Sequence, residues 1–306
     1  MNESDDRTER SGAAQNRITA RPPAPAGGVP RTIGLVIPHL AHSSFADPVR
    51  GMTDVLAGEG YELLLGLSGD SPQSEFAQVT ALLEQRVSGL SLTGAIRDAR
   101  TTEAIRRAGI PVVETSTLKG PCNDMVVGFS NEAAAGAMVR HLADCGYRKI
   151  GLISPGASND DRSADRQAGY RQAIEALELA SDPGLIVESG IDLAAGARAF
   201  LELVGAHPDV EAIFCTSDVL AVGAMLEAVR CGIRVPGDLG IAGFDDLELA
   251  QQFVPALTTV RLRRYEIGRV SARLLLQRIR GETPAQAVVD LGFEIMPRDS
   301  TRRTPA

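Results

Sequence analysis

The sequence has no long apolar run and few cysteines. No stretch of its 306 residues reaches the roughly 18 apolar residues that a membrane-spanning helix requires, and the N-terminus lacks the apolar core of a secretory signal peptide. The four cysteines, Cys122, Cys145, Cys215 and Cys231, show no Cys-x-x-Cys spacing, which predicts reduced thiols rather than disulfides or a metal site. These absences favour a cytoplasmic protein over a membrane protein or a periplasmic sugar-transport protein.

Motifs for catalysis and for cofactor binding are also absent. Histidine occurs only at His39, His42, His141 and His207. These positions do not have the spacing of a metal site, and the sequence contains neither a Gly-x-Ser-x-Gly elbow nor a phosphate-binding Gly-x-x-x-x-Gly-Lys-Ser loop. For the two histidines that follow the first predicted strand, and for the acidic pair at 160–161, solvent exposure is a simpler explanation than ligand binding. The sequence therefore predicts a protein that is not an enzyme and holds neither a metal nor a cofactor.

The first 30 residues have the composition of a disordered tail. Their larger aliphatic residues are Met1, Ile18 and Val29 alone, prolines stand at positions 22, 23, 25 and 30, and acidic residues alternate with arginines. Compact domains begin at about 50 residues, so this segment is too short for a DNA-binding domain. The net charge of −8 also opposes binding to phosphates. We therefore expect no DNA binding by this chain alone.

Beyond the tail, short apolar runs alternate with segments of helical periodicity. Strands are predicted near 32–37, 62–67, 88–93, 111–114, 125–128, 149–153, 185–188, 211–215, 238–243, 257–260 and 288–295. Helices are predicted between most of them; Ser71 before Pro72 marks a helix start, and Gly60, Gly146 and Gly232 mark helix ends. Alternating strands and helices predict an α/β fold with parallel sheets.

The segment 212–246 is the most informative part of the chain. It has the pattern of a buried strand, a helix capped by Ser217, and a second buried strand that ends in a turn at 244–246. In open parallel sheets, residues at the carboxyl ends of strands line the ligand crevice. Ser217, Asp218, Asp245 and Asp246 are therefore candidate ligand contacts. Serine and aspartate are also common caps and turn formers, and the spacing alone does not separate these two roles.

Five motifs occur in the order in which they occur in the lactose-repressor (LacI/GalR) family, which the chain resembles. They are Arg31-Thr-Ile-Gly-Leu-Val-Ile-Pro38, Val127-Gly-Phe-Ser-Asn-Glu-Ala-Ala-Ala-Gly136 with His141-Leu-Ala-Asp-Cys-Gly-Tyr-Arg-Lys-Ile150, Arg166-Gln-Ala-Gly-Tyr170, the segment 212–246, and Pro255-Ala-Leu-Thr-Thr-Val-Arg261. The resemblance covers roughly residues 31 to 301, so it does not depend on any single motif.

The resemblance implies two similar parallel-sheet lobes of the periplasmic-binding-protein-like type, with a chain that crosses between them three times. It places residues 31–154 and 261–287 in the first lobe and residues 155–260 and 288–301 in the second, after the disordered tail 1–30. Family members carry a helix-turn-helix headpiece before the first strand. Because the tail has prolines and no helical periodicity, we expect this headpiece to be missing, and operator DNA to be contacted only through such a headpiece.

The resemblance also implies a ligand site between the lobes. The residues that match the family's site are Ser43, Ser44 and Phe45 in the first lobe and Arg166, Ser217 and Asp245 in the second. Arg166 opens a helix, where a cation is unfavourable to the helix dipole, and this placement points to an anionic partner. Phe45 also begins an apolar helical face, so a place in the core is the alternative for it. Leu262 departs from the family, which often has a ligand-binding glutamine there, and this puts a polar contact at that place in doubt.

Four segments resemble the gluconate-repressor branch of the family, namely 111–114, 124–131, 214–223 and 290–293. They imply a small sugar acid as effector, since Arg166 can pair with a carboxylate while Asp245 and Ser217 serve a polyol chain. Apolar residues of the helices near 45–59 and 270–279 exceed what one lobe needs to bury and predict a homodimer. Two functions stay open: the core of a LacI-family transcriptional regulator, its headpiece lost or cut off by a wrong start site, and a stand-alone cytoplasmic sugar-binding sensor without DNA binding.

Overall fold

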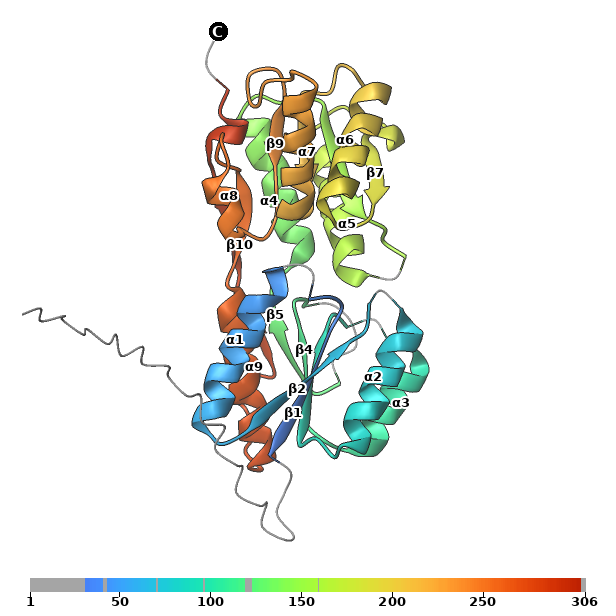
Figure 1. The fold of residues 1–306 in the computed structure, drawn as a ribbon, viewed down its shortest axis with the longest axis vertical. Helices are drawn as coiled ribbons and strands as arrows, with labels where there is room; N and C mark the ends of the chain where they lie inside the picture. The colour runs from blue at the N-terminus through green and yellow to red at the C-terminus, as the bar shows by residue number, and fades with distance from the viewer. Residues whose placement is uncertain are drawn as a thin grey trace, which may run out of the picture.

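The computed structural model describes residues 31–40, 43–69, 71–95, 97–118, 123–158 and 160–303. The tail predicted at 1–30 lies outside the described residues. Two lobes are stacked along the long axis of the molecule, and each contains a parallel sheet between helices (Figure 1). The predicted α/β class with parallel sheets is confirmed. None of the described helices is both long and apolar enough to cross a membrane.

The first lobe contains a six-stranded parallel sheet in the order β11-β5-β4-β3-β1-β2. Its strands are β1 (Thr32–Ile37), β2 (Glu62–Leu67), β3 (Gly89–Thr93), β4 (Val112–Thr115), β5 (Met125–Gly128) and β11 (Val288–Asp290). Its helices are α1 (Ala46–Gly58), which follows the 3-10 helix η1 (Ser43–Phe45), α2 (Pro72–Glu84), α3 (Ala99–Ala108) and α9 (Arg264–Ile279). Helices α1 and α9 pack together on one face of the sheet, and α2 and α3 cover the other (Figure 1).

The second lobe contains a four-stranded parallel sheet in the order β7-β6-β8-β9. Its strands are β6 (Ile150–Pro155), β7 (Ile186–Ser189), β8 (Ala212–Cys215) and β9 (Gly240–Ala242). Its helices are α4 (Asn131–Asp144), α5 (Asp161–Ala176), α6 (Leu193–Ala206), α7 (Asp218–Arg230) and α8 (Glu248–Gln252), with 3-10 helices η2 (Pro183–Leu185) and η3 (Asp299–Thr301). Helix α4 packs on α5, and α6 packs on α7.

The chain passes between the lobes three times. The first passage lies between β5 and α4, the second between β10 (Thr259–Leu262) and α9, and the third between β11 and β12 (Phe293–Met296). Strands β10 and β12 form a two-stranded antiparallel sheet of their own, from the pair Thr259–Met296 to the pair Leu262–Phe293. This ladder joins the second and third passages to each other.

The structure corrects two of the lobe boundaries that we expected. Residues 131–154 belong to the second lobe, because β6 pairs with β7 and β8 and α4 packs on α5. Residues 288–290 belong to the first lobe, because β11 pairs with β5. The strand predicted over 288–295 is two strands, separated at Gly292 with a φ of +66°. Apolar patterning predicts a strand, but it does not show which of the two sheets the strand joins.

Local sequence signals explain most helix boundaries. Ser71 caps α2 by accepting a hydrogen bond from the backbone N–H of Ser74, and Pro72 occupies the first helical position. After the helices α1, α4 and α7, Gly60, Gly146 and Gly232 adopt φ values of +73°, +89° and +72°. This left-handed conformation satisfies the last carbonyl groups of a helix at little steric cost when the residue is glycine.

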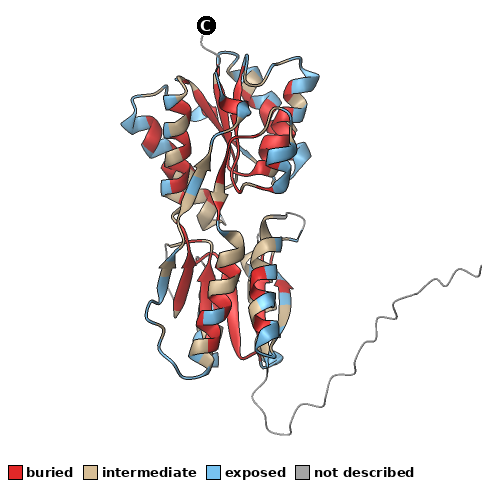
Figure 2. Cartoon of the chain, turned by 90° about the vertical axis from the view of Figure 1, so that its left-hand side faces the viewer, coloured by how far each residue is buried: buried red, intermediate tan, exposed pale blue. Residues whose placement is uncertain are grey.

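In each lobe, the strands of its own parallel sheet form the buried centre (Figure 2). In the first lobe, α1 and α9 approach so closely that a Cβ atom on Gly268 would lie 1.9 Å from the carbonyl oxygen of Pro48. The apolar residues that we expected at a dimer contact fill this interface and the sheet below it: Val49, Met52, Val55, Leu56, Leu274, Leu275 and Ile279. The excess of apolar residues in α1 and α9 is therefore used within the lobe, and it does not by itself indicate a dimer.

Candidate functional site between the lobes

A cavity of about 280 Å³ lies between the two lobes, near the lower end of the roughly 300–1,000 Å³ of small-molecule sites. The residues that follow β1, β4, β6, β7 and β9 contribute to its wall. This is the crevice at the carboxyl ends of parallel strands where open α/β sheets bind ligands. Helix α5 contributes polar side chains to the wall, while η1, α1, β10 and α9 contribute mainly apolar ones.

Arg166 reaches the cavity from α5 in a fixed orientation. Its Nε donates a hydrogen bond to Asn131 Oδ1 at 2.9 Å, and its Nη1 donates to the carbonyl oxygen of Thr216 at 2.7 Å. Its guanidinium carbon lies 3.8 Å from the centroid of the Phe244 ring, a cation–π contact. Burial lowers the pKa of Arg166, although the nearby carboxylate of Asp245 opposes this shift. Contacts within the second lobe alone thus position this cation.

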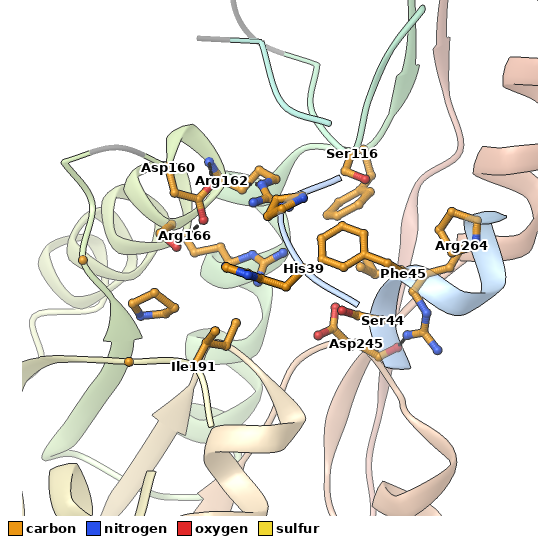
Figure 3. A pocket seen from close by; sticks show the side chains of 18 of the residues that line it. His39, Ser44, Phe45, Ser116, Asp160, Arg162, Arg166, Ile191, Asp245 and Arg264 are labelled. Carbon is orange, nitrogen blue, oxygen red and sulfur yellow. Dashed lines mark hydrogen bonds and ion pairs between the residues drawn. The ribbon is translucent and has the colours of Figure 1, made fainter. Parts of the chain in front are cut away.

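Arg162 precedes Arg166 by one helical turn and points into the same cavity (Figure 3). Asp160 caps α5 and accepts hydrogen bonds from Arg162 Nε at 2.8 Å and from Ser163 Oγ at 2.8 Å. Burial lowers the pKa of Arg162, but Asp160 and Asp161 outweigh it and the net shift is upward. The guanidinium of Arg162 also lies 5.9 Å from the ring centroid of Phe45 in the first lobe.

Two neighbouring aspartates in the turn after β9 have different surroundings. Asp245 has a φ of +118° and lines the cavity, and its backbone N–H donates to the carbonyl oxygen of Val260 at 2.9 Å. Asp246 does not line the cavity; its carboxylate pairs with Arg261 at 2.7 Å and with Arg298 at 2.5 Å. The two ion pairs fasten the turn to β10 and to the segment after β12.

Arg264, the first residue of α9, connects this turn to the first lobe. Its Nη1 donates to the carbonyl oxygen of Asp245, and its Nη2 pairs with Asp47 of α1 at 3.2 Å. Arg264 also lines the cavity. The position of Asp245 therefore depends on both lobes.

Asp218 supports the same turn from inside the second lobe. It is 1% exposed, and it accepts hydrogen bonds from the backbone N–H of Leu247 at 2.7 Å and from Thr259 Oγ1 at 2.5 Å. Burial, followed by the charge of Asp245, raises the pKa of Asp218 to about 7. The turn has no room for a side chain at Gly243, where a Cβ atom would lie 2.2 Å from Asp218 Oδ1. Asp218 is thus a structural carboxyl group that positions Asp245.

The structure brings four of the six predicted ligand-binding residues together at the cavity. These are Ser44, Phe45, Arg166 and Asp245. Ser217 is not among the lining residues; it is 3% exposed, and its hydroxyl accepts a hydrogen bond from the backbone N–H of Val219 as the cap of α7. The side chain of Ser43 lies outside the described part of the structure. The binding role of all six residues stays a prediction.

Several lining residues are absent from the predicted set. Arg162, Asp160, Ser163 and Arg264 line the cavity, and so does His39, which we expected in a solvent-facing loop. The four-residue spacing between Arg162 and Arg166 places them on one face of a helix, and this signal is available in the sequence. The placement of Arg264 and Asp160 at the cavity depends on how the lobes and turns pack together, and the sequence does not show this. His42 lies outside the described residues.

The two lobes also contact each other directly at the start of α5. Asp161 Oδ2, at the start of α5, accepts a hydrogen bond from the backbone N–H of Ala95 after β3 at 2.9 Å. Arg97 stabilises this loop, because its Nη2 donates a hydrogen bond to the carbonyl oxygen of Gly94 at 2.6 Å. Arg97 is almost fully buried and pairs with Glu75 at 3.4 Å and with Glu114 at 3.8 Å.

Comparison with known proteins identifies this architecture. The model of the periplasmic binding protein-like domain family matches residues 139–301. The HTH-type transcriptional regulator GntR of Escherichia coli (strain K12) is 36% identical over 271 residues, which cover 88% of this chain and 81% of that protein.

Solved structures agree with this match. The transcription regulator GntR from Chromobacterium violaceum is 36% identical, with a TM-score of 0.85 over 89% of this chain and all of that chain. A LacI family transcriptional regulator from Silicibacter pomeroyi is 30% identical, with a TM-score of 0.81 over 88% of this chain and 98% of that chain. These relatives are regulators of transcription and not enzymes. The chain belongs to the LacI family of transcriptional regulators, and its two lobes form the family's periplasmic-binding-protein-like domain.

Proposed function

We propose that this chain is the effector-binding core of a cytoplasmic transcriptional regulator and that its effector is a small sugar acid such as gluconate. The charge of the cavity is the observation that carries the proposal. Two arginines on one face of α5, Arg162 and Arg166, line the cavity, and the hydrogen bonds of Arg166 go to the uncharged groups of Asn131 and Thr216. Such a pair of buried cations suits a ligand that carries a carboxylate. Likeness to regulators named GntR supports the same choice.

The other lining residues suit the polyol part of such a ligand. Asp245 offers a carboxylate that accepts hydrogen bonds from hydroxyl groups, and Ser44 and Ser163 offer hydroxyls that can donate or accept. Phe45 and Ile191 provide apolar surface for the C–H groups of the sugar chain. A mixture of apolar walls and a few converging polar groups is typical of small-molecule sites.

The site between two lobes also suggests how binding is transmitted. A ligand held by Arg166 and Asp245 of the second lobe and by Phe45 of the first favours the closed arrangement over an open one. That shift alters DNA binding in a regulator whose lobes carry a helix-turn-helix headpiece, and so controls transcription. A ligand that bound both arrangements equally well would have no such effect.

Titration calorimetry with D-gluconate, D-glucose, D-ribose and adenine tests the proposed effector class. We expect heat of binding with gluconate at micromolar to millimolar concentration and much weaker binding of the two uncharged sugars. Binding of adenine alone, or equal affinity for glucose and gluconate, contradicts the proposal. A shift in the thermal unfolding temperature with gluconate, measured in the same buffers, is an independent readout.

We also propose that the core forms a homodimer, as regulators that read paired operator half-sites do. Leu226 and Val229, one turn apart on α7, are 38% and 68% exposed and offer apolar surface for a second copy. Sedimentation velocity at tens of micromolar should show a dimer, and Val229→Glu should shift it toward the monomer. A monomeric wild-type core at these concentrations contradicts the proposed dimer.

A further inference from the structure

Two arginines, one helical turn apart on α5, reach the cavity, but their contacts differ. Arg166 uses Nε and Nη1 for hydrogen bonds to Asn131 and Thr216, and its flat face covers the ring of Phe244. All three partners belong to the framework of the second lobe. Replacing Arg166 therefore changes the wall of the cavity itself, and this affects any ligand, whether charged or not.

The contacts of Arg162 leave the end of its guanidinium directed toward the cavity. Its side chain is fixed by one ion pair within the described part of the chain, from Nε to Asp160 at 2.8 Å. The edge formed by Nη1 and Nη2 is the edge that can bind a carboxylate through two parallel hydrogen bonds. The side chain is 16% exposed, so water competes little with such a pair.

Arg162 also lies against the first lobe. Its guanidinium carbon is 5.9 Å from the ring centroid of Phe45, at the entry to α1. Figure 3 shows Arg162 and Arg166 extending from one helix toward the part of the cavity where Phe45 lies. A carboxylate bound at Arg162 therefore lies where the two lobes meet, whereas the contacts of Arg166 remain inside one lobe.

We propose that Arg162 is the residue that distinguishes an acid from an uncharged polyol in this cavity, and that Arg166 is a positioning residue that serves both. This assignment rests on the proposed function, since it names the group that recognises the carboxylate of the effector. It moves the anion-selective role one helical turn from Arg166, for which the sequence pattern predicts it.

The test compares D-gluconate with D-glucitol, which carries an alcohol in place of the carboxylate. In Arg162→Gln we expect gluconate affinity to fall about tenfold or more, as loss of a charge-assisted pair predicts, and glucitol affinity to stay within about twofold. Arg166→Gln should weaken both ligands. Arg171→Gln removes a charge from the same helix at an exposed site and should change neither.

Arg162→Lys provides a second variant, because it keeps the charge but lacks the planar fork. It should bind gluconate more weakly than the wild type and more tightly than Arg162→Gln, again with little change for glucitol. Circular dichroism and thermal unfolding show whether each variant is folded. If Arg162→Gln is unfolded, the comparison between Arg162→Lys and the wild type decides the assignment.

The possible outcomes separate the two proposals. If the wild-type protein does not bind gluconate, the proposed effector class is wrong. If the wild type binds gluconate but the Arg162 variants lose both ligands equally, or lose neither, the role of Arg162 is wrong while the effector class stands. A selective loss of gluconate in Arg166→Gln alone also overturns the assignment and returns the selective role to Arg166.

Discussion

The two lobes contribute different chemistry to the same cavity. The second lobe supplies Arg166, Asp160 and Asp245. Arg166 is held by hydrogen bonds to Asn131 and Thr216. Asp160 is held by an ion pair with Arg162, and Asp245 by the hydrogen bond from its backbone N–H to Val260. The first lobe supplies mainly apolar surface, including Phe45, Pro48 and Ile267. Sheets of the same parallel type therefore position charged groups in one lobe and, in the other, apolar side chains that cover the cavity. If the cavity binds the proposed effector, this difference predicts that the second lobe selects the ligand and that the first excludes water from it.

The largest effect is expected from a change in how the first lobe packs. Gly268→Ala places a Cβ atom where the Pro48 carbonyl oxygen is 1.9 Å away. Because backbone on both α1 and α9 must shift, the free energy of unfolding should fall by about 3 kcal/mol, the upper part of the usual range for overpacking. Gly58→Ala is the matched control, since a Cβ atom there meets nothing within 4 Å. Equal stability of both variants in urea unfolding contradicts this account.

Stability should depend on pH through Asp218, which is buried in the second lobe. The raised pKa of Asp218, about 7, means that the folded protein keeps a proton that the unfolded chain releases near pH 4. This group therefore stabilises the fold most below about pH 4, and its contribution decreases as pH rises to about 7, by up to about 1.4 kcal/mol per pH unit.

Asp218→Asn isolates this contribution. The amide group of asparagine has nearly the same volume as the carboxyl group and keeps an oxygen that accepts the hydrogen bond from the Leu247 N–H, but it does not titrate between pH 4 and 7. The difference in unfolding free energy between variant and wild type should therefore change in favour of the variant as pH rises from 4 to 7. Urea unfolding at four pH values measures it, and a difference that does not vary with pH refutes the raised pKa.

Ligand affinity should depend more on the charged residues of the second lobe than on the apolar residues of the first. Asp245→Asn keeps a side chain that tolerates positive φ but removes the charge that accepts hydrogen bonds from hydroxyls. Affinity for gluconate and for glucitol should fall about tenfold. Phe45→Leu retains an apolar cover and should cost about threefold or less, because it changes area rather than charge. The reverse order in calorimetry would place ligand selection in the first lobe.

The smallest effect is expected at the contact between the lobes. Asp161→Ala removes the acceptor for the Ala95 N–H group and leaves the residues that line the cavity in place. Because the contact joins the two lobes in the arrangement seen here, affinity for glucitol, which carries no charge, should fall about twofold, the lower end of what one hydrogen bond contributes. Glu202→Ala, an exposed charge on α6, is the control. Unchanged glucitol affinity in Asp161→Ala would contradict a role of this contact in ligand binding.

The sequence predicts the local elements of this fold better than their assembly. Helix starts such as Ser71-Pro72 and helix ends at glycine follow from local chemistry, and the structure confirms them. The sequence does not show to which lobe α4, β6 and β11 belong. This depends on which sheet each strand joins, and apolar patterning does not distinguish the two sheets. The three passages between lobes are visible in sequence only through resemblance to a family.

The candidate site shows the same limit. Spacing identifies Arg166 and Asp245 because strand ends and helix starts of an α/β fold converge. It cannot distinguish Asp245 from Asp246, whose side chains diverge at a turn with φ values of +118° and +53°. It predicts Ser217 as a helix cap but does not show that its side chain stays out of the cavity. The placement of the two aspartates depends on backbone dihedral angles and on partners such as Arg261, which is 15 residues from Asp246.

The pairing of β10 with β12 restricts how the lobes can move. Four consecutive residue pairs, from Thr259–Met296 to Leu262–Phe293, join two of the three connecting segments side by side. The hydrogen bonds of an antiparallel pair hold neighbouring strands at a fixed spacing. The second and third passages therefore lie side by side and move together. A ligand that stabilises one arrangement of the lobes thus also fixes the relative orientation of surfaces far from the cavity, without a relay of side chains between them.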